Sequence, residues 1–134
     1  MKLTTKEKDF VQWLRVARVA TVGSDDVPHN VPVCPLFENN KIYFGTERSA
    51  RKMRNIEDNP SVTIVFDEYG EAWDYLRGIM LQGKARIVDT KEFREFRKKI
   101  YAKYPQYERN APLGDRDSVI VEVTPERKFS WGIE

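Results

Sequence analysis

The stretch WDYLRGIMLQGKARIVD, residues 73–89, decides the fold. Its composition predicts one long strand, in which Gly78 and Gly83 interrupt the run of larger side chains. Glycines inside a long strand are typical of a sheet that bends to close a small barrel. Further strand-like runs are expected over residues 18–23, 27–37, 42–46, 61–69 and 118–123. About six antiparallel strands with inserted helices predict a mainly β protein, a closed or partly closed β-barrel.

Three helical segments are expected, one before the first strand and two between later strands. Thr4 and Glu7 form a capping box at the start of the first helix, and Thr90 is expected to cap the third. The second helix is expected to follow Ser49 as its N-cap and to end near residues 59–60. Residues 104–117 contain two prolines and are expected to be irregular.

Residues 27–37 read as an extended segment with three prolines, at positions 28, 32 and 35. Proline cannot donate a hydrogen bond to a neighbouring strand, so this segment is expected at the edge of the sheet or at a bulge. A turn at Asn39 and Asn40 leads into the next strand.

Three cations, Arg51, Lys52 and Arg54, lie in the first turn of the second helix. The helix dipole disfavours cations there by some tenths of a kcal/mol each. Cations beside free backbone N–H groups form a site for an anion, most naturally a phosphate. The alternative is an exposed helix whose cations are simply solvated, and the local sequence favours neither interpretation.

Composition limits the possible functions. A chain of 134 residues predicts a single domain spanning residues 1–134. The net charge of +2 gives little support for nucleic-acid binding, and no aromatic residue falls between Gly45 and Pro60, beside the cations. The polar start and the lack of a long apolar run predict a cytoplasmic protein without a membrane partner.

Few residues in the chain suggest catalysis. With one histidine and one cysteine, no metal site is expected. His29 is interpreted as a turn or interface residue, and Cys34 as a small buried apolar residue. No catalytic residue can be named, so an enzyme of this sequence would rely on a bound cofactor for its chemistry.

Four passages, taken in order, resemble the flavin-binding split-barrel family of pyridoxamine-5'-phosphate-oxidase-like proteins. They are the pair of segments 19–22 and 28–33, the segment 42–56 with Ser49-Ala50-Arg51-Lys52, the segment 59–66, and the segment 80–87 with Gly83-Lys84-Ala85. The resemblance spans about residues 18–88.

The resemblance implies a split barrel that binds FMN, or in one branch the deazaflavin coenzyme F420, at a homodimer interface. It places Thr46, Arg51 and Lys52 at the cofactor phosphate, and the backbone of Val31, Pro32 and Val33 beside the flavin ring. It also implies that Trp131 approaches the ring from the other subunit.

Three departures from the family pattern argue against pyridoxamine phosphate as the substrate. Gly78 replaces a glutamine that contacts the flavin, Ala50 replaces a phosphate-site serine, and the substrate-binding tail is missing after Trp131. The sequence therefore predicts an FMN-dependent oxidoreductase that exchanges hydride with a small conjugated substrate. The alternatives are an F420-dependent reductase of the same fold and a flavin-binding protein without turnover.

Overall fold

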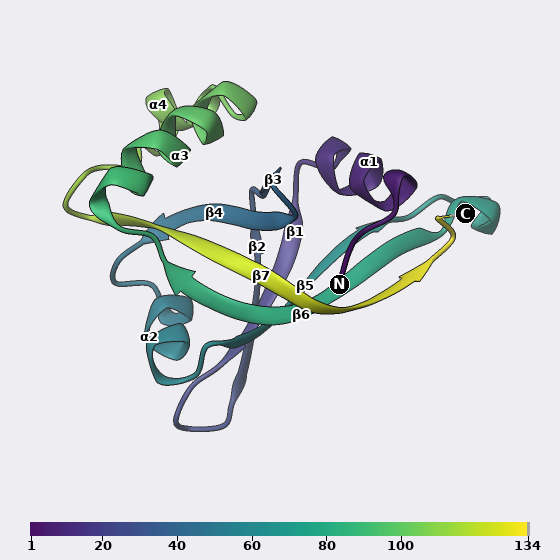
Figure 1. The fold of residues 1–134 in the computed structure, drawn as a ribbon, viewed down its shortest axis with the longest axis horizontal. Helices are drawn as coiled ribbons and strands as arrows, with labels where there is room; N and C mark the ends of the chain where they lie inside the picture. The colour runs from purple at the N-terminus through teal and green to yellow at the C-terminus, as the bar shows by residue number, and fades with distance from the viewer. Residues whose placement is uncertain (134) are drawn as a thin grey trace.

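The computed structural model describes residues 1–133. One antiparallel sheet of seven strands, in the order β2-β1-β5-β6-β7-β4-β3, curls into a half-barrel (Figure 1). The strands are β1 (Ala17–Val22), β2 (Pro28–Val33), β3 (Leu36–Glu38), β4 (Lys41–Glu47), β5 (Ser61–Glu68), β6 (Arg77–Ile87) and β7 (Ser118–Trp131). The helices are α1 (Thr5–Trp13), α2 (Arg51–Asp58), the 3-10 helix η1 (Trp73–Tyr75), α3 (Thr90–Lys103) and α4 (Gln106–Asn110).

The mainly β, split-barrel architecture predicted from the sequence is confirmed. The sheet has seven strands rather than about six because residues 27–37 divide into β2 and β3. The expected long strand begins at Arg77 rather than at Trp73, because the three residues from Trp73 form η1. Within it, the pairing register with β7 shifts between Gln82 and Gly83. A Cβ atom at Gly83 would lie 2.0 Å from the Thr124 carbonyl oxygen, so only glycine permits this bend.

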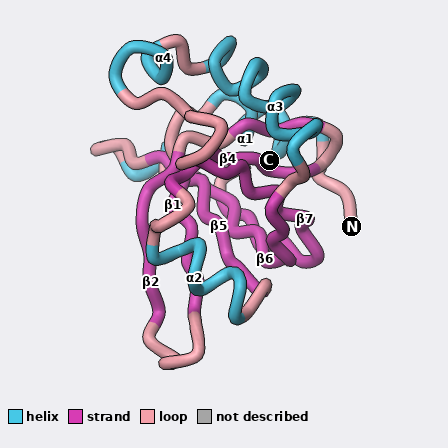
Figure 2. Tube along the Cα trace, turned by 90° about the vertical axis from the view of Figure 1, so that its left-hand side faces the viewer, coloured by secondary structure: helices cyan, strands magenta, loops and turns pink. Residues whose placement is uncertain are grey.

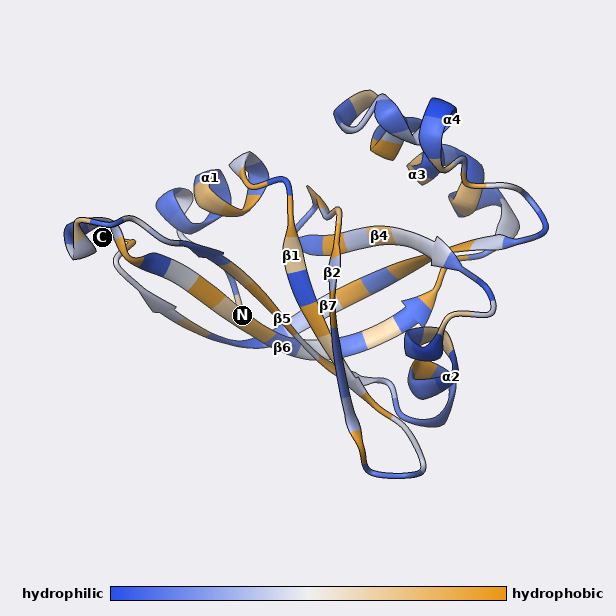
Figure 3. Ribbon diagram, turned by 180° about the vertical axis from the view of Figure 1, so that it is seen from behind, coloured by the Kyte–Doolittle hydropathy of each residue, from blue (hydrophilic) through white to orange (hydrophobic). Residues whose placement is uncertain are grey.

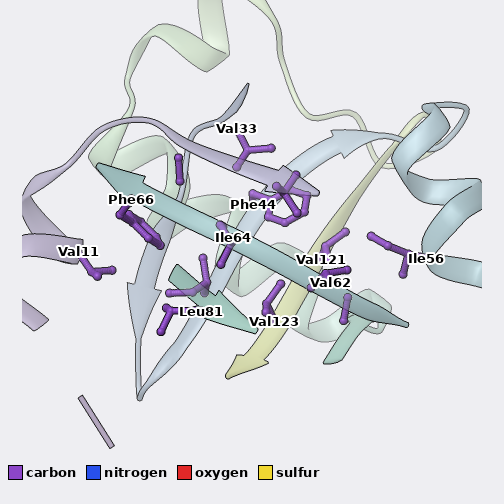
Figure 4. Close-up of a cluster of buried hydrophobic side chains, with 14 of the residues drawn as sticks. Val11, Val33, Phe44, Ile56, Val62, Ile64, Phe66, Leu81, Val121 and Val123 are labelled. Carbon is purple, nitrogen blue, oxygen red and sulfur yellow. The ribbon is translucent and has the colours of Figure 1, made fainter. Parts of the chain in front are cut away.

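The barrel core consists of side chains that alternate along the strands with outward-facing residues. Phe44, Ile64, Leu81 and Val121 point into it from four different strands (Figure 4). A second apolar cluster lies between the sheet and α3, where the Tyr43 and Phe96 rings stack with centroids 3.9 Å apart. Because α3 covers this side of the sheet, β7 is buried on both faces from Ser118 to Val123.

Several expected boundaries are corrected. The capping box of Thr4 and Glu7 is present as predicted. Asp89, not Thr90, caps α3, because its carboxylate accepts the Glu92 N–H at 2.8 Å. Residues 104–117 contain the short helix α4, and the last strand continues beyond residue 123 to Trp131. Among residues 1–133, no helix is both long enough and apolar enough to cross a bilayer.

Candidate functional site

The start of α2 has no side-chain cap. The sequence predicted Ser49 as the N-cap, and this is wrong: Ala50 occupies that position and makes no side-chain hydrogen bond. The Ala50 N–H donates to the Glu47 carbonyl at 3.1 Å, and this turn shifts the helix start by one residue. The alanine side chain offers no acceptor, so the N–H groups of Arg51 and Lys52 are left for an anionic ligand, whereas that of Met53 donates to the Ala50 carbonyl oxygen at 3.0 Å.

Two cations occupy the first turn of this uncapped helix. Arg51 forms an ion pair with Asp25 and donates through Nε to Asn55 Oδ1 at 3.3 Å. Lys52 is half-buried, and this burial lowers the pKa of its ammonium group, an effect that Glu47 partly opposes. No carboxylate of the described chain forms an ion pair with Lys52. An anion bound here would offset its partial desolvation.

A buried amide fixes α2 against the hairpin of β1 and β2. Asn55 Nδ2 donates to Thr21 Oγ1 at 3.0 Å, and both residues are buried. A Cβ atom at Gly23 would lie 2.5 Å from Asn55 Oδ1, so glycine allows this close approach. The sequence analysis did not identify Asn55. The local signal was weak: Asn55 is a polar residue directly before Ile56, one of the apolar positions of the helix.

The strand expected beside the flavin ring is an edge strand, as its prolines predicted. Val31 lies opposite Val19 and Val33 opposite Ala17, whereas Pro32 faces outward and is exposed. On its other side, β2 has no strand neighbour among residues 1–133. His29 belongs to this strand rather than to a turn, and its Nδ1 is buried without a hydrogen-bond partner in the described chain.

The predicted site residues fall at two ends of the molecule. Thr46 is buried near the end of β4, five residues before Arg51. The hairpin of β1 and β2 lies beside α2, most of whose residues are hydrophilic (Figure 3). Trp131 is at the opposite end of the sheet, paired with Gly78 on β6 (Figure 1). Within one chain, therefore, Trp131 does not meet the other predicted residues.

Cys34 is half-buried and lines a cavity near α4, so its interpretation as a buried apolar residue is corrected. Residues 1–133 contain no cluster of three or more His, Cys, Asp or Glu side chains placed to hold a metal ion.

The curled antiparallel sheet, with the cationic, uncapped helix beside its open edge, defines the class: a split β-barrel. The sequence model of the family described as pyridoxamine 5'-phosphate oxidase matches residues 3–132. The chain belongs to this family.

Relatives within this fold carry different functional descriptions. The chain is 28% identical to the 5a,11a-dehydrotetracycline/5a,11a-dehydrooxytetracycline reductase of Streptomyces rimosus, over all of this chain and 86% of that protein. The heme storage protein HutZ of Vibrio cholerae has a TM-score of 0.80 at 19% identity, covering 96% of this chain and 94% of that one. A structure described as an F420 reductase has a TM-score of 0.77 at 20% identity, covering 95% and 98%. The two structural likenesses support the fold alone.

Proposed function

We propose that the protein is an FMN-dependent oxidoreductase that exchanges hydride with a small, flat, conjugated substrate. Membership of the pyridoxamine 5'-phosphate oxidase family and the similarity to a reductase support oxidoreductase chemistry of the flavin or deazaflavin type. The observation that carries the proposal is the partly desolvated Lys52 beside Arg51 on the uncapped start of α2. These donors suit a phosphate, which FMN carries at one end and F420 carries within its side chain.

Each predicted site residue would have a distinct role in binding the cofactor. Arg51 and Lys52 bind the phosphate, with Thr46 nearby, and the backbone of residues 31–33 positions the ring at the open edge of the sheet. Bound FMN supplies the hydride chemistry. Each charge-assisted hydrogen bond to the phosphate contributes about 1.5–3 kcal/mol, or about ten- to a hundredfold in affinity.

A homodimer would complete this site. Val65, Met80 and Phe129 lie opposite one another on β5, β6 and β7, on the face turned away from the barrel core. The Phe129 side chain is exposed, and its ring lies 5.8 Å from that of Trp131. Pairing of this face with a second copy would bury the apolar row and could bring Trp131 to the partner's flavin. We expect Phe129→Glu to convert a dimer into a monomer in sedimentation experiments, and a wild-type monomer would refute this arrangement.

The phosphate assignment is tested by a charge-matched pair of variants. Arg51→Ala combined with Lys52→Ala should remain folded and lose affinity for FMN by about a hundredfold or more. Arg54→Ala with Arg48→Ala removes the same charge from exposed neighbours and should change affinity only slightly. Equal losses of FMN affinity in both double variants would mean that the cations attract FMN only through their general charge, and would overturn the assignment.

The choice of cofactor and the question of turnover have direct readouts. A yellow protein with flavin absorption bands supports FMN, and tighter binding of added F420 than of FMN supports the deazaflavin alternative. Reduction of the bound cofactor by NAD(P)H, or oxidation of its reduced form by an electron acceptor, distinguishes an enzyme from a non-catalytic flavin-binding protein.

A further inference from the structure

A cavity of about 420 Å³ lies where the strand proposed to hold the flavin ring ends. Its lining includes Cys34, the residue that follows the last position of β2, together with Arg15 and two tyrosines of the α3–α4 region, Tyr104 and Tyr107. The β1–β2 hairpin runs from its turn beside α2 towards the α3–α4 pair (Figure 2). The cavity therefore lies at the end of the hairpin opposite the phosphate site.

This placement suits a ligand bound next to the flavin ring. His29 is opposite Thr21, which hydrogen-bonds to α2, and Val33 is the last residue of the strand. His29 and Val33 are about 13 Å apart at the usual rise of a strand. A ribityl chain and a flavin ring can extend along such a length. The far edge of the ring would then reach Cys34 and the mouth of the cavity.

The cavity walls are aromatic and held in place. The Tyr104 hydroxyl donates to the Pro35 carbonyl at 2.6 Å, and the Tyr104 ring meets that of Tyr107 edge-on with centroids 6.2 Å apart. The Tyr107 ring also lies 6.2 Å from Tyr101, whose hydroxyl accepts the Leu113 N–H at 2.8 Å. Fixed rings of this kind favour a flat, conjugated ligand at little conformational cost.

Arg15, which lines the cavity, and its neighbour Lys103 lack a carboxylate partner. The Arg15 guanidinium lies 4.7 Å from the Tyr104 ring centroid and donates to the Lys103 carbonyl oxygen at 2.7 Å. Lys103 Nζ donates to the carbonyl oxygens of Leu14 and Pro35 at 3.1 and 2.8 Å. Neither cation forms an ion pair with an acidic side chain of the described chain. The cavity therefore keeps an uncompensated positive charge.

We propose that this cavity binds the substrate as an aromatic acid, with its ring between Tyr107 and the flavin and its carboxylate at Arg15. The assignment deepens the proposed function and rests on the flavin lying along residues 31–33. Arg15 is a specificity-determining residue in this arrangement, because a guanidinium binds a carboxylate through two parallel hydrogen bonds. A neutral ligand of the same shape would leave the positive charge of the Arg15 guanidinium unpaired.

The test uses 4-hydroxybenzoate and its neutral analogue 4-hydroxybenzamide as probes, titrated by calorimetry into the protein with and without FMN. We expect the acid to bind at least tenfold more tightly than the amide. Arg15→Gln should remove this preference and leave the affinity for FMN unchanged. Arg109→Gln, an exposed cation on α4 outside the cavity lining, is the control and should behave as the wild type.

Equal binding of acid and amide, no binding of either, or an unchanged preference in Arg15→Gln would overturn the proposal. The acid should also shift the absorption bands of bound FMN, because the two rings would be in contact. Tight binding without such a shift would place the cavity apart from the flavin and refute its role as substrate pocket. Failure of FMN to bind the wild type would refute the proposed function and, with it, the stacking of the acid on the flavin. The preference of the cavity for the acid, measured without cofactor, would then be judged by itself.

Discussion

Gly78 and Trp131 face each other across β6 and β7 so closely that a Cβ atom at Gly78 would lie 2.4 Å from Cζ2 of the indole. The same atom would lie 2.8 Å from the Phe66 carbonyl oxygen. The absence of a side chain at this position therefore creates the space that the indole occupies. The glycine at position 78 and the orientation of the Trp131 indole are therefore two parts of one feature.

Gly78→Ala should displace Trp131 and destabilise the protein by about 1–3 kcal/mol, the usual cost of overpacking. The midpoint of urea unfolding measures this loss. Combining Gly78→Ala with Trp131→Ala should cost less than the sum of the two single changes, because the contact with the indole is removed. Strict additivity would contradict the direct contact.

Asn55→Ala should loosen α2 from the hairpin. The change leaves the buried Thr21 hydroxyl without its donor and Arg51 without one of its two acceptors, so a loss of about 1–3 kcal/mol in unfolding free energy is expected. Glu57→Ala, an exposed position on the same helix, is the matched control. If both variants unfold at the same denaturant concentration, Asn55 does not anchor the helix.

Asp25→Asn should strengthen phosphate binding. The backbone N–H of Val27, and then the Arg51 guanidinium, lower the pKa of Asp25, so its carboxylate is ionised at neutral pH and competes for Arg51. An exposed ion pair contributes little in water, so a gain of at most a few-fold in FMN affinity is expected. Asp26→Asn changes the same charge in the same turn and should have a smaller effect. Weaker binding by Asp25→Asn would mean that the ion pair mainly orients Arg51 for the ligand.

Lys103 should make stability depend on pH in the alkaline range. Burial, and then the Arg15 charge, lower the pKa of Lys103 to about 8 in the folded chain. Below about pH 8 the Lys103 ammonium is charged in both the folded and the unfolded chain. Because folding buries this charge, it then opposes folding. Between about pH 8 and 10 the unfolded chain binds more protons, so the free energy of unfolding should rise with pH.

Lys103→Met removes this contribution, so the difference in unfolding free energy between variant and wild type should change across that interval. Urea unfolding at pH 7 and pH 9.5 provides the comparison, and other titrating groups cancel in it. A constant difference would show that Lys103 keeps its ordinary pKa.

Local patterns made much of the fold predictable. The caps of α1, the prolines of the edge strand and the alternation of Val119, Val121 and Val123 depend on neighbours in the sequence, and each appears in the structure as expected. The division of residues 27–37 into two strands was not predicted, since a run of extended residues does not show where its pairing partner changes.

The site was harder to predict because its contacts join distant residues. The Arg51–Asp25 pair spans 26 residues and the Asn55–Thr21 bond spans 34. The cations of α2 were visible in the sequence as a local anomaly. Their acidic partner and the buried amide depend on how the hairpin folds back over the helix, which no short sequence pattern records. The aromatic cavity behind Cys34 was missed for the same reason.

The unpaired edge of β2 has a consequence for solubility. A free strand edge can pair with other chains and begin aggregation, and proline is one of the residues that prevent it. Pro28 and Pro32 interrupt the row of N–H donors along this strand, so a second chain cannot extend the sheet there in regular register. The prolines that leave this edge without a neighbouring strand thus also protect it from pairing with other chains, and we expect a variant that restores the N–H donors to aggregate more readily.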